Sequence, residues 1–315
     1  MTRLVDWKSA GIEEAAFWRY VREQIFTLRG VECPEESLTV LLTGSRAIGA
    51  HTAESDVDID VLCPDAVYCA MHQAALESGL IRAANSFFLT APKEGWERYF
   101  GAGKGRPHFS VMRLQEVERH FREYVDVFLW VWTNAGVVHD PHGQFSGIVE
   151  TFRGYPRDML VRKIKYHVLM AWYWDVEVFP HHSRTDGKLL AASTALLNGM
   201  TELLRVFFLA EGKPYPYTEQ LWPLAQATPL GRDFLDMFQR VTDLVVGNRC
   251  AEQDIFERLL DAAKMLFWSD AFEECRRLDA ALDQAMLDAG VEPEWVEAGF
   301  GNIEELLSGA LGPPP

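Results

Sequence analysis

Residues 56–61 alternate strictly between aspartate and an apolar side chain, in the order Asp-Val-Asp-Ile-Asp-Val. Alternation with a period of two is typical of a β-strand, because successive side chains of a strand point to opposite faces. Asp56, Asp58 and Asp60 would then share one face, and the apolar side chains between them would enter a core. A chain with such a strand needs a hydrophobic layer on one side and a means of neutralising three carboxylates on the other.

The nature of the counter-charge is left open by the triplet alone. Mg²⁺ is a simple solution, since it prefers hard oxygen ligands and takes one or two carboxylates together with water and substrate phosphates. A solvated strand face, or salt bridges to neighbouring arginine and lysine side chains, would account for the same pattern. The residues before the triplet therefore have to distinguish a metal site from a solvated or salt-bridged strand face.

A second strand is predicted at 37–43, SLTVLLT, and it stops at Gly44-Ser45. Glycine lets the backbone approach a phosphate closely, and the serine offers both its N–H and its hydroxyl. Ten residues separate Ser45 from Asp56. A hairpin of this length can bring Gly44-Ser45 back beside the carboxylates, so that a metal-bound triphosphate would meet N–H donors at one end and oxygen ligands at the other.

The full run GSRAIGAHTAESDVDIDV resembles the signature of the polymerase-β-like nucleotidyltransferase superfamily, in particular its minimal and antibiotic-modifying branches. Gly44-Ser45, the ten-residue spacing and Asp56-Val57-Asp58 carry the resemblance. It is convincing over residues 37–63, and a looser likeness in the order of elements extends to about residue 112.

The resemblance implies a role for each residue of this signature. Gly44 and Ser45 would bind the β- and γ-phosphates, and Asp56 and Asp58 would hold one or two Mg²⁺ ions. In the two-metal scheme, ions roughly 3.5–4 Å apart stabilise the entering and leaving oxygens of an in-line displacement. The residues expected at the nucleotide are Gly44, Ser45, Arg46 and Ser55, and those expected to be catalytic are Asp56, Asp58 and Asp60. Arg46 could neutralise triphosphate charge or be a surface arginine on the loop.

The sequence departs from the superfamily at the third carboxylate. Members that use two metals usually supply it from a later strand, and the candidate strand here, RPHFSVMRL, contains no acid. Its role would fall to Asp60, to Glu116 or Glu118 just beyond the strand, or to His108 as a base that binds no metal. If no residue fills the role, the protein would bind a nucleotide without transferring it.

The pattern of apolar residues changes near Leu114. Before it, strands and helices alternate; after it, the spacing becomes helical almost without interruption. The predicted elements are helices at 11–29, 65–80, 114–124 and 124–135 and strands at 37–43, 56–63, 81–90 and 106–114, followed by helices to the end of the chain. We therefore expect an α+β fold, with a polymerase-β-like nucleotidyltransferase domain and mixed sheet at 1–140 and an all-helical, substrate-binding domain at 141–315.

Charge and composition limit the partners. The formal net charge of −16 would repel a phosphate backbone, so a long nucleic acid is not expected. The five cysteines include no Cys-x-x-Cys pair, and no apolar run suits a signal peptide or a membrane span. We expect a cytoplasmic protein with no membrane partner.

The favoured activity is transfer of a nucleoside monophosphate, AMP from ATP, to a hydroxyl of a small molecule, with Mg²⁺ as cofactor and pyrophosphate as product. Two alternatives stay open: a protein acceptor, as in antitoxin-type members, and a degenerate protein that binds nucleotide only. In the helical half, Lys163 and Lys165 could contact phosphates or edge an apolar helix, and Tyr215 and Tyr217 could stack on a base or pack in the core.

Overall fold

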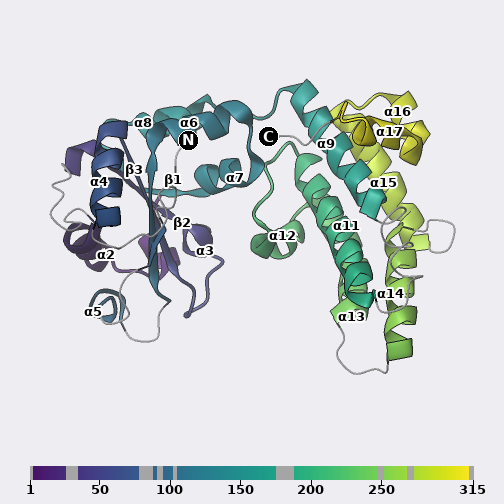
Figure 1. Cartoon of the computed structure of the whole chain (residues 1–315), viewed down its shortest axis with the longest axis horizontal. Coiled ribbons are helices and arrows are strands. Elements are labelled where there is room, and N and C mark those ends of the chain that lie inside the picture. The colour runs from purple at the N-terminus through teal and green to yellow at the C-terminus, as the bar shows by residue number, and fades with distance from the viewer. Residues whose placement is uncertain are drawn as a thin grey trace. The chain divides into compact units, whose positions relative to one another are not determined.

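The computed structural model describes residues 3–25, 35–77, 88–90, 95–101, 105–174, 188–246, 252–267 and 273–311. The chain forms two compact units, Met1–Arg153 and Gly154–Pro315 (Figure 1). The first contains a mixed sheet and the second, over its described residues, is helical. The predicted α+β fold class, a sheet domain followed by an all-helical domain, is confirmed.

The sheet of the first unit has six strands in the order β1-β6-β2-β3-β5-β4. Their bounds are Arg3–Leu4 (β1), Thr39–Thr43 (β2), Val57–Cys63 (β3), Phe88–Thr90 (β4), Pro107–Arg113 (β5) and Gly136–His139 (β6). β3 lies in the middle, antiparallel to β2 and parallel to β5. The strands expected at 37–43, 56–63 and 106–114 are therefore present as neighbours, while most of the strand expected at 81–90 falls outside the described residues.

Ten helical segments surround this sheet in the described part of the first unit. The α-helices are Trp7–Ala10 (α1), Glu14–Tyr20 (α2), Gly44–Ala47 (α3), Asp65–Glu77 (α4), Glu97–Phe100 (α5), Leu114–Glu123 (α6), Asp126–Asn134 (α7) and Gln144–Thr151 (α8). A π-helix at Val21–Ile25 (η1) continues α2, and a 3₁₀ helix at Glu35–Ser37 (η3) precedes β2.

One face of the sheet packs on a hydrophobic core. Val57, Ile59 and Val61 of β3 are at most 1% exposed. They share a cluster with apolar residues of β5, α2 and α4, namely Phe109, Val111, Phe17, Tyr20 and Met71. The apolar half of the alternation at 56–61 thus supplies the core, and the aspartates lie on the opposite face.

Strand β6 is absent from the sequence prediction, which makes the chain helical after Leu114. Four residues are too few to show a strand period, and the partners of β6 come from distant parts of the chain. A Cβ atom at Gly136 would lie 2.7 Å from the side chain of Val5, so glycine allows β1 to approach.

The first unit also extends beyond the expected boundary after residue 140. Helix α8 follows that point and belongs to the first unit, because it packs on α6. Phe145 at its start is fully buried and meets Trp132 of α7 edge to face, with ring centroids 6.4 Å apart. A boundary drawn after residue 140 leaves out this packing, which the pattern of neighbouring residues does not show.

The second unit is built from helices that pack along one another. Their bounds are Arg157–Trp172 (α9), Leu189–Leu209 (α11), Thr218–Ala225 (α12), Pro229–Val246 (α13), Glu252–Phe267 (α14), Glu273–Ala289 (α15), Pro293–Ala298 (α16) and Ile303–Leu307 (α17), with a 3₁₀ turn at Gly299–Asn302 (η5). Helix α11 contacts α9, α12, α13 and α14 and forms the centre of the unit. Within the described ranges, no helix is long and apolar enough to span a bilayer.

Candidate active site

The acidic strand and the glycine turn meet as the hairpin argument predicts. In the antiparallel register of β2 and β3, Thr43 lies opposite Asp58, and Gly44 follows Thr43 directly. Gly44 has a φ of 66°, in the left-handed region that favours glycine. A Cβ atom there would lie 2.9 Å from Cγ of Asp58, so a side chain at this position would displace the carboxylate. The structure therefore places the backbone of the turn against the acidic face.

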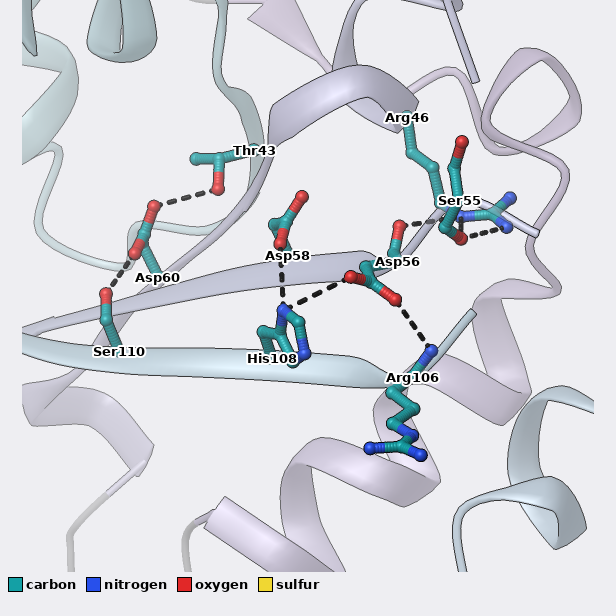
Figure 2. A network of polar contacts seen from close by, with 9 residues as sticks. All are labelled: Thr43, Arg46, Ser55, Asp56, Asp58, Asp60, Arg106, His108 and Ser110. Carbon is teal, nitrogen blue, oxygen red and sulfur yellow. Dashed lines mark hydrogen bonds and ion pairs between the residues drawn. The ribbon is translucent and has the colours of Figure 1, made fainter. Parts of the chain in front are cut away.

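Two carboxylates and one imidazole converge beside this turn (Figure 2). Nδ1 of His108 lies 3.4 Å from Oδ2 of Asp56 and 3.8 Å from Oδ1 of Asp58. The backbone N–H of Arg106 donates to Oδ1 of Asp56 over 3.0 Å. Asp56 and Asp58 remain 44% and 35% exposed at their side chains, so a ligand can reach them.

His108 reaches this position because β5 runs parallel to β3 with Asp58 and His108 directly across from each other. β5 is the later strand from which the resemblance leads us to expect a third carboxylate, and it contains no acid. Glu116 and Glu118 lie on α6, beyond the far end of β5, which is roughly 16 Å along the strand from His108. Of the residues considered for the third group, His108 is the one that the structure brings to Asp56 and Asp58.

The carboxylate of Asp60 points to other partners. Its Oδ2 accepts a hydrogen bond of 2.8 Å from the hydroxyl of Thr43, and its Oδ1 accepts one from the hydroxyl of Ser110. In Figure 2 the contacts of Asp60 run to these two hydroxyls, whereas Asp56 and Asp58 both contact His108 and Asp56 also accepts from the N–H of Arg106. Asp60 thus shares the strand face of the other two aspartates and belongs to a separate hydrogen-bonded group.

Burial makes the acidic face electrostatically costly. Desolvation raises the pKa of Asp58 to about 6, the proximity of His108 opposes the rise, and the charges of Asp60 and Asp56 add to it. Desolvation also raises the pKa of Asp60, against the hydrogen bonds from Ser110 and Thr43. Positive charge at Asp56 and Asp58 would relieve this cost, which is the electrostatic requirement of a cation site.

Arg46 is buried, with 2% of its surface exposed. Its Nη2 and Nε donate to the carbonyl of Ser55 over 2.7 and 3.1 Å, and Nε also donates to the carbonyl of Asp56 over 3.0 Å. Nη1 donates to the carbonyl of Ala10 over 3.0 Å. Desolvation lowers the pKa of Arg46, while Asp56 and then Asp58 oppose the shift. The guanidinium therefore holds the backbone that leads into Asp56, and its contribution to the site is indirect.

Ser55 also shapes this loop. Its hydroxyl accepts a hydrogen bond of 2.9 Å from the N–H of Thr52, while its carbonyl is bound by Arg46. The hydroxyl of Ser45 makes no hydrogen bond to another described residue in the structure, whereas its carbonyl accepts one from the N–H of Ala50 over 2.9 Å. Of these two serines, Ser45 is the one whose side chain is available to a ligand.

Two neighbours of Asp56 were missed by the sequence reasoning. Gly105 packs so closely that a Cβ atom on it would overlap the backbone of Ser55 and Asp56, and Arg106 supplies the N–H that binds the Asp56 carboxylate. The carbonyl of Arg106 in turn accepts a hydrogen bond of 3.0 Å from the N–H of Val57. The glycine just before RPHFSVMRL is the one signal in the sequence that points to this close approach.

Among solved structures, the chain is similar to one described as a nucleotidyltransferase-like protein from Exiguobacterium sibiricum. The two chains share 12% sequence identity with a TM-score of 0.40, and the similarity covers 94% of this chain and 90% of that one. No protein-family model matches the chain, and a search of curated proteins found no match.

The helical unit places its expected contact residues mainly in packing roles. Lys163 is fully buried, and its Nζ lies 5.7 Å from the ring centroid of Tyr155. Nζ of Lys165 lies 2.7 Å from Glu292. Tyr215 is buried, and its ring meets His167 edge to face with centroids 5.2 Å apart. Tyr217 stays partly exposed at the start of α12.

Proposed function

We propose that this protein is a nucleotidyltransferase that transfers AMP from ATP to a hydroxyl of a small molecule and releases pyrophosphate. One observation carries the proposal: Asp56 and Asp58 converge with His108 directly beside the Gly44 turn. Oxygen ligands, a base and a closely approachable backbone are the three groups that such a transfer requires. The resemblance of the signature to polymerase-β-like enzymes supports the same reaction.

The donor set fits Mg²⁺. Asp56 and Asp58 offer carboxylate oxygens two residues apart on one strand face, and both side chains can be reached from solvent. The described residues contain no group of three or more acidic, histidine or cysteine ligands suited to hold a metal by themselves. Mg²⁺ does not need three protein ligands, because it completes its coordination shell with water and substrate phosphates. Asp56 and Asp58 would hold one or two ions, which when bound neutralise the phosphate charge that develops during transfer.

The chain's own groups have distinct tasks in the transfer. Gly44 and Ser45 bind the β- and γ-phosphates through the partly exposed backbone of the turn and the available hydroxyl of Ser45. Arg46 and Ser55 hold the loop that positions Asp56. The acceptor oxygen forms a bond to the α-phosphorus, and the bond from that phosphorus to the bridging oxygen breaks, with its electron pair leaving on pyrophosphate.

His108 takes the proton of the acceptor hydroxyl. Its Nδ1 faces the carboxylates of Asp56 and Asp58, which favours the tautomer with the proton on Nδ1 and the lone pair on Nε2. This arrangement follows the general rule that a carboxylate orients a histidine base through one ring nitrogen and leaves the other to accept a proton. The imidazole would thus replace the missing third carboxylate as the base.

The proposal is tested by measuring pyrophosphate release from ATP with Mg²⁺ and a panel of small hydroxyl compounds. We expect release that depends on an added acceptor, and its loss in Asp56→Asn and Asp58→Asn with the fold retained. His108→Ala should lower turnover by about 10²-fold and change ATP binding little. Glu118→Gln, which removes an exposed carboxylate on α6, is the matched control and should keep wild-type rates.

Other outcomes separate the remaining functions. Radiolabel transferred from ATP to protein, in place of a small compound, would indicate a protein acceptor. Calorimetric ATP binding without turnover by any acceptor would indicate a nucleotide-binding protein. Full activity in either aspartate variant would rule out this site as the catalytic centre.

A further inference from the structure

Asp60 completes the Asp-Val-Asp-Ile-Asp alternation, yet both of its carboxylate oxygens are engaged by the protein. Oδ2 accepts from the hydroxyl of Thr43 on β2 and Oδ1 from the hydroxyl of Ser110 on β5. Asp60 itself lies on β3, so its carboxylate joins three neighbouring strands (Figure 2). Such hydroxyl–carboxylate bonds are charge-assisted and are stronger than bonds between neutral groups.

The two hydroxyl donors stand next to functional positions. Thr43 is the residue before Gly44, so it fixes the start of the phosphate-binding turn. Ser110 lies two residues after His108 and points to the same face of β5. In the register between β3 and β5, Ser110 pairs with Asp60 and His108 pairs with Asp58. On β3 and β5 the hydrogen-bonded group therefore lies two residues further along the strand than Asp58 and His108. On β2 its donor Thr43 lies opposite Asp58 and directly before Gly44.

We propose that Asp60 is a positioning residue that holds the Gly44 turn and the His108 strand in register with Asp56 and Asp58, and that it binds no metal. The proposal deepens the nucleotidyltransferase function and rests on it for its kinetic consequences. Misplacing a reacting group by about 1 Å can cost on the order of 10²-fold in rate. A carboxylate that accepts from both flanking strands limits such displacement on either side of β3.

The test compares two replacements that differ in hydrogen bonding. Asn at position 60 can accept from one hydroxyl and donate to the other, so Asp60→Asn keeps both links and removes the charge. Asp60→Leu has similar size and keeps neither link. Thr39→Val is the matched control, because Thr39 lies on the same strand as Thr43 and donates over 3.2 Å to a different carboxylate, that of Asp140.

Three measurements are made on each full-length variant: turnover, affinity for Mn²⁺ alone by electron paramagnetic resonance, and hydrogen exchange of the amides at 44–46. We expect Asp60→Leu to lower kcat by about 10- to 100-fold and Asp60→Asn by no more than about threefold. Both should bind Mn²⁺ within about threefold of wild type. Amide exchange at the turn should accelerate in Asp60→Leu and stay unchanged in Asp60→Asn and Thr39→Val.

The hydroxyl partners provide an independent check. Thr43→Val and Ser110→Ala should each lower kcat, and combining Thr43→Val with Asp60→Leu should cost no more than Asp60→Leu alone, since the link is already broken. Additive losses in the double variant would contradict the shared link.

Several results would overturn the proposal. A loss of Mn²⁺ affinity of about tenfold or more in Asp60→Asn, similar to that in Asp58→Asn, would make Asp60 a ligand. Unchanged kcat and unchanged amide exchange in folded Asp60→Leu would remove its positioning role. If wild type transfers nothing to any acceptor, the proposed function fails, and Mn²⁺ affinity with amide exchange still decide the role of Asp60.

Discussion

Gly44 combines two constraints in one residue: a positive φ and a close approach to Asp58. Gly49 shares the first constraint, with a φ of 73°, but a Cβ atom there would meet nothing within 4 Å. We expect Gly49→Ala to lose about 1–2 kcal/mol of stability from the left-handed backbone. Gly44→Ala should lose at least as much, because its Cβ atom must also displace Asp58. Only Gly44→Ala, and more strongly Gly44→Val, should weaken ATP binding with Mg²⁺, measured by calorimetry. Equal ATP affinity in Gly44→Val and wild type would contradict the contact between turn and phosphates.

The raised pKa of Asp58 predicts that the stability of the metal-free protein depends on pH. Its pKa in the folded state, about 6, lies above the ordinary value of 3.8, mainly through desolvation. A raised carboxyl pKa means that the folded state binds the proton more tightly, so stability falls as pH rises from about 4 to 6 and stays lowered above it. Asp58→Asn removes this penalty. In a chelator, the variant should melt about 2–4 °C higher than wild type at pH 8.

The control for this effect is Glu118→Gln, which removes an exposed carboxylate of the same unit. At pH 8 it should have the same melting temperature as wild type. At pH 4 the melting temperature of Asp58→Asn should no longer exceed that of wild type. An equal gain for Asp58→Asn at both pH values would mean that its charge is not the cause.

At the scale of the secondary-structure elements, the loop 48–56 between α3 and β3 is held by one side chain of α3, that of Arg46. Arg46 binds the carbonyls of Ser55 and Asp56 at one end of the loop and that of Ala10 beyond it. Lysine has one charged nitrogen and cannot reproduce this planar set of donors. We expect Arg46→Lys to cost about 2–3 kcal/mol in urea unfolding, because buried carbonyls lose their donors, and to weaken Mn²⁺ binding through displacement of Asp56.

Arg22→Lys is the comparison for Arg46→Lys. Arg22 pairs with Glu35 over 3.2 Å, and its side chain is 58% exposed. Exposed ion pairs contribute roughly 0–1 kcal/mol, so this change should leave unfolding and Mn²⁺ binding nearly unaltered. If Arg46→Lys behaves in the same way, the loop is held by other contacts.

At the scale of the whole molecule, the helical unit contains a buried ion-paired group centred on Glu202. The carboxylate lies 2.5 Å from Nδ1 of His167 and 2.7 Å from Nη1 of Arg205. Desolvation raises the pKa of Glu202, but the combined attraction of His167 and Arg205 outweighs it and leaves the pKa below its ordinary value of 4.5. A lowered pKa stabilises the fold above pH 4.5, and that contribution is lost as the pH falls below it.

Glu202→Gln should therefore destabilise the helical unit by about 3–5 kcal/mol at pH 7, since it leaves buried partners unpaired, and by less at pH 4. Hydrogen exchange measured in increasing denaturant reports the stability of each unit separately. We expect the exchange rates of amides in the sheet unit to be unaffected. Glu219→Gln on α12, an exposed position, should change neither unit. Equal destabilisation of both units would show that they unfold as one.

The sequence alone determined what depends on neighbours along the chain. The period of two at 56–61 sets the buried and acidic faces of β3, the glycine ends β2, and the ten-residue spacing allows the hairpin between them. Sustained helical spacing likewise predicts the second unit. Each of these features follows from local geometry.

The tertiary structure decided which side chains meet. His108 faces Asp58 because of the register between β3 and β5, two strands separated in sequence by about 50 residues. The same register gives Asp60 its partner Ser110 and removes it from the group of Asp56 and Asp58, although periodicity places all three aspartates on one face. The burial of Arg46 and the insertion of β6 next to β2 also depend on distant segments. Period and spacing specify a face and a turn, whereas cross-strand register specifies contacts, and register is set by packing of the whole sheet.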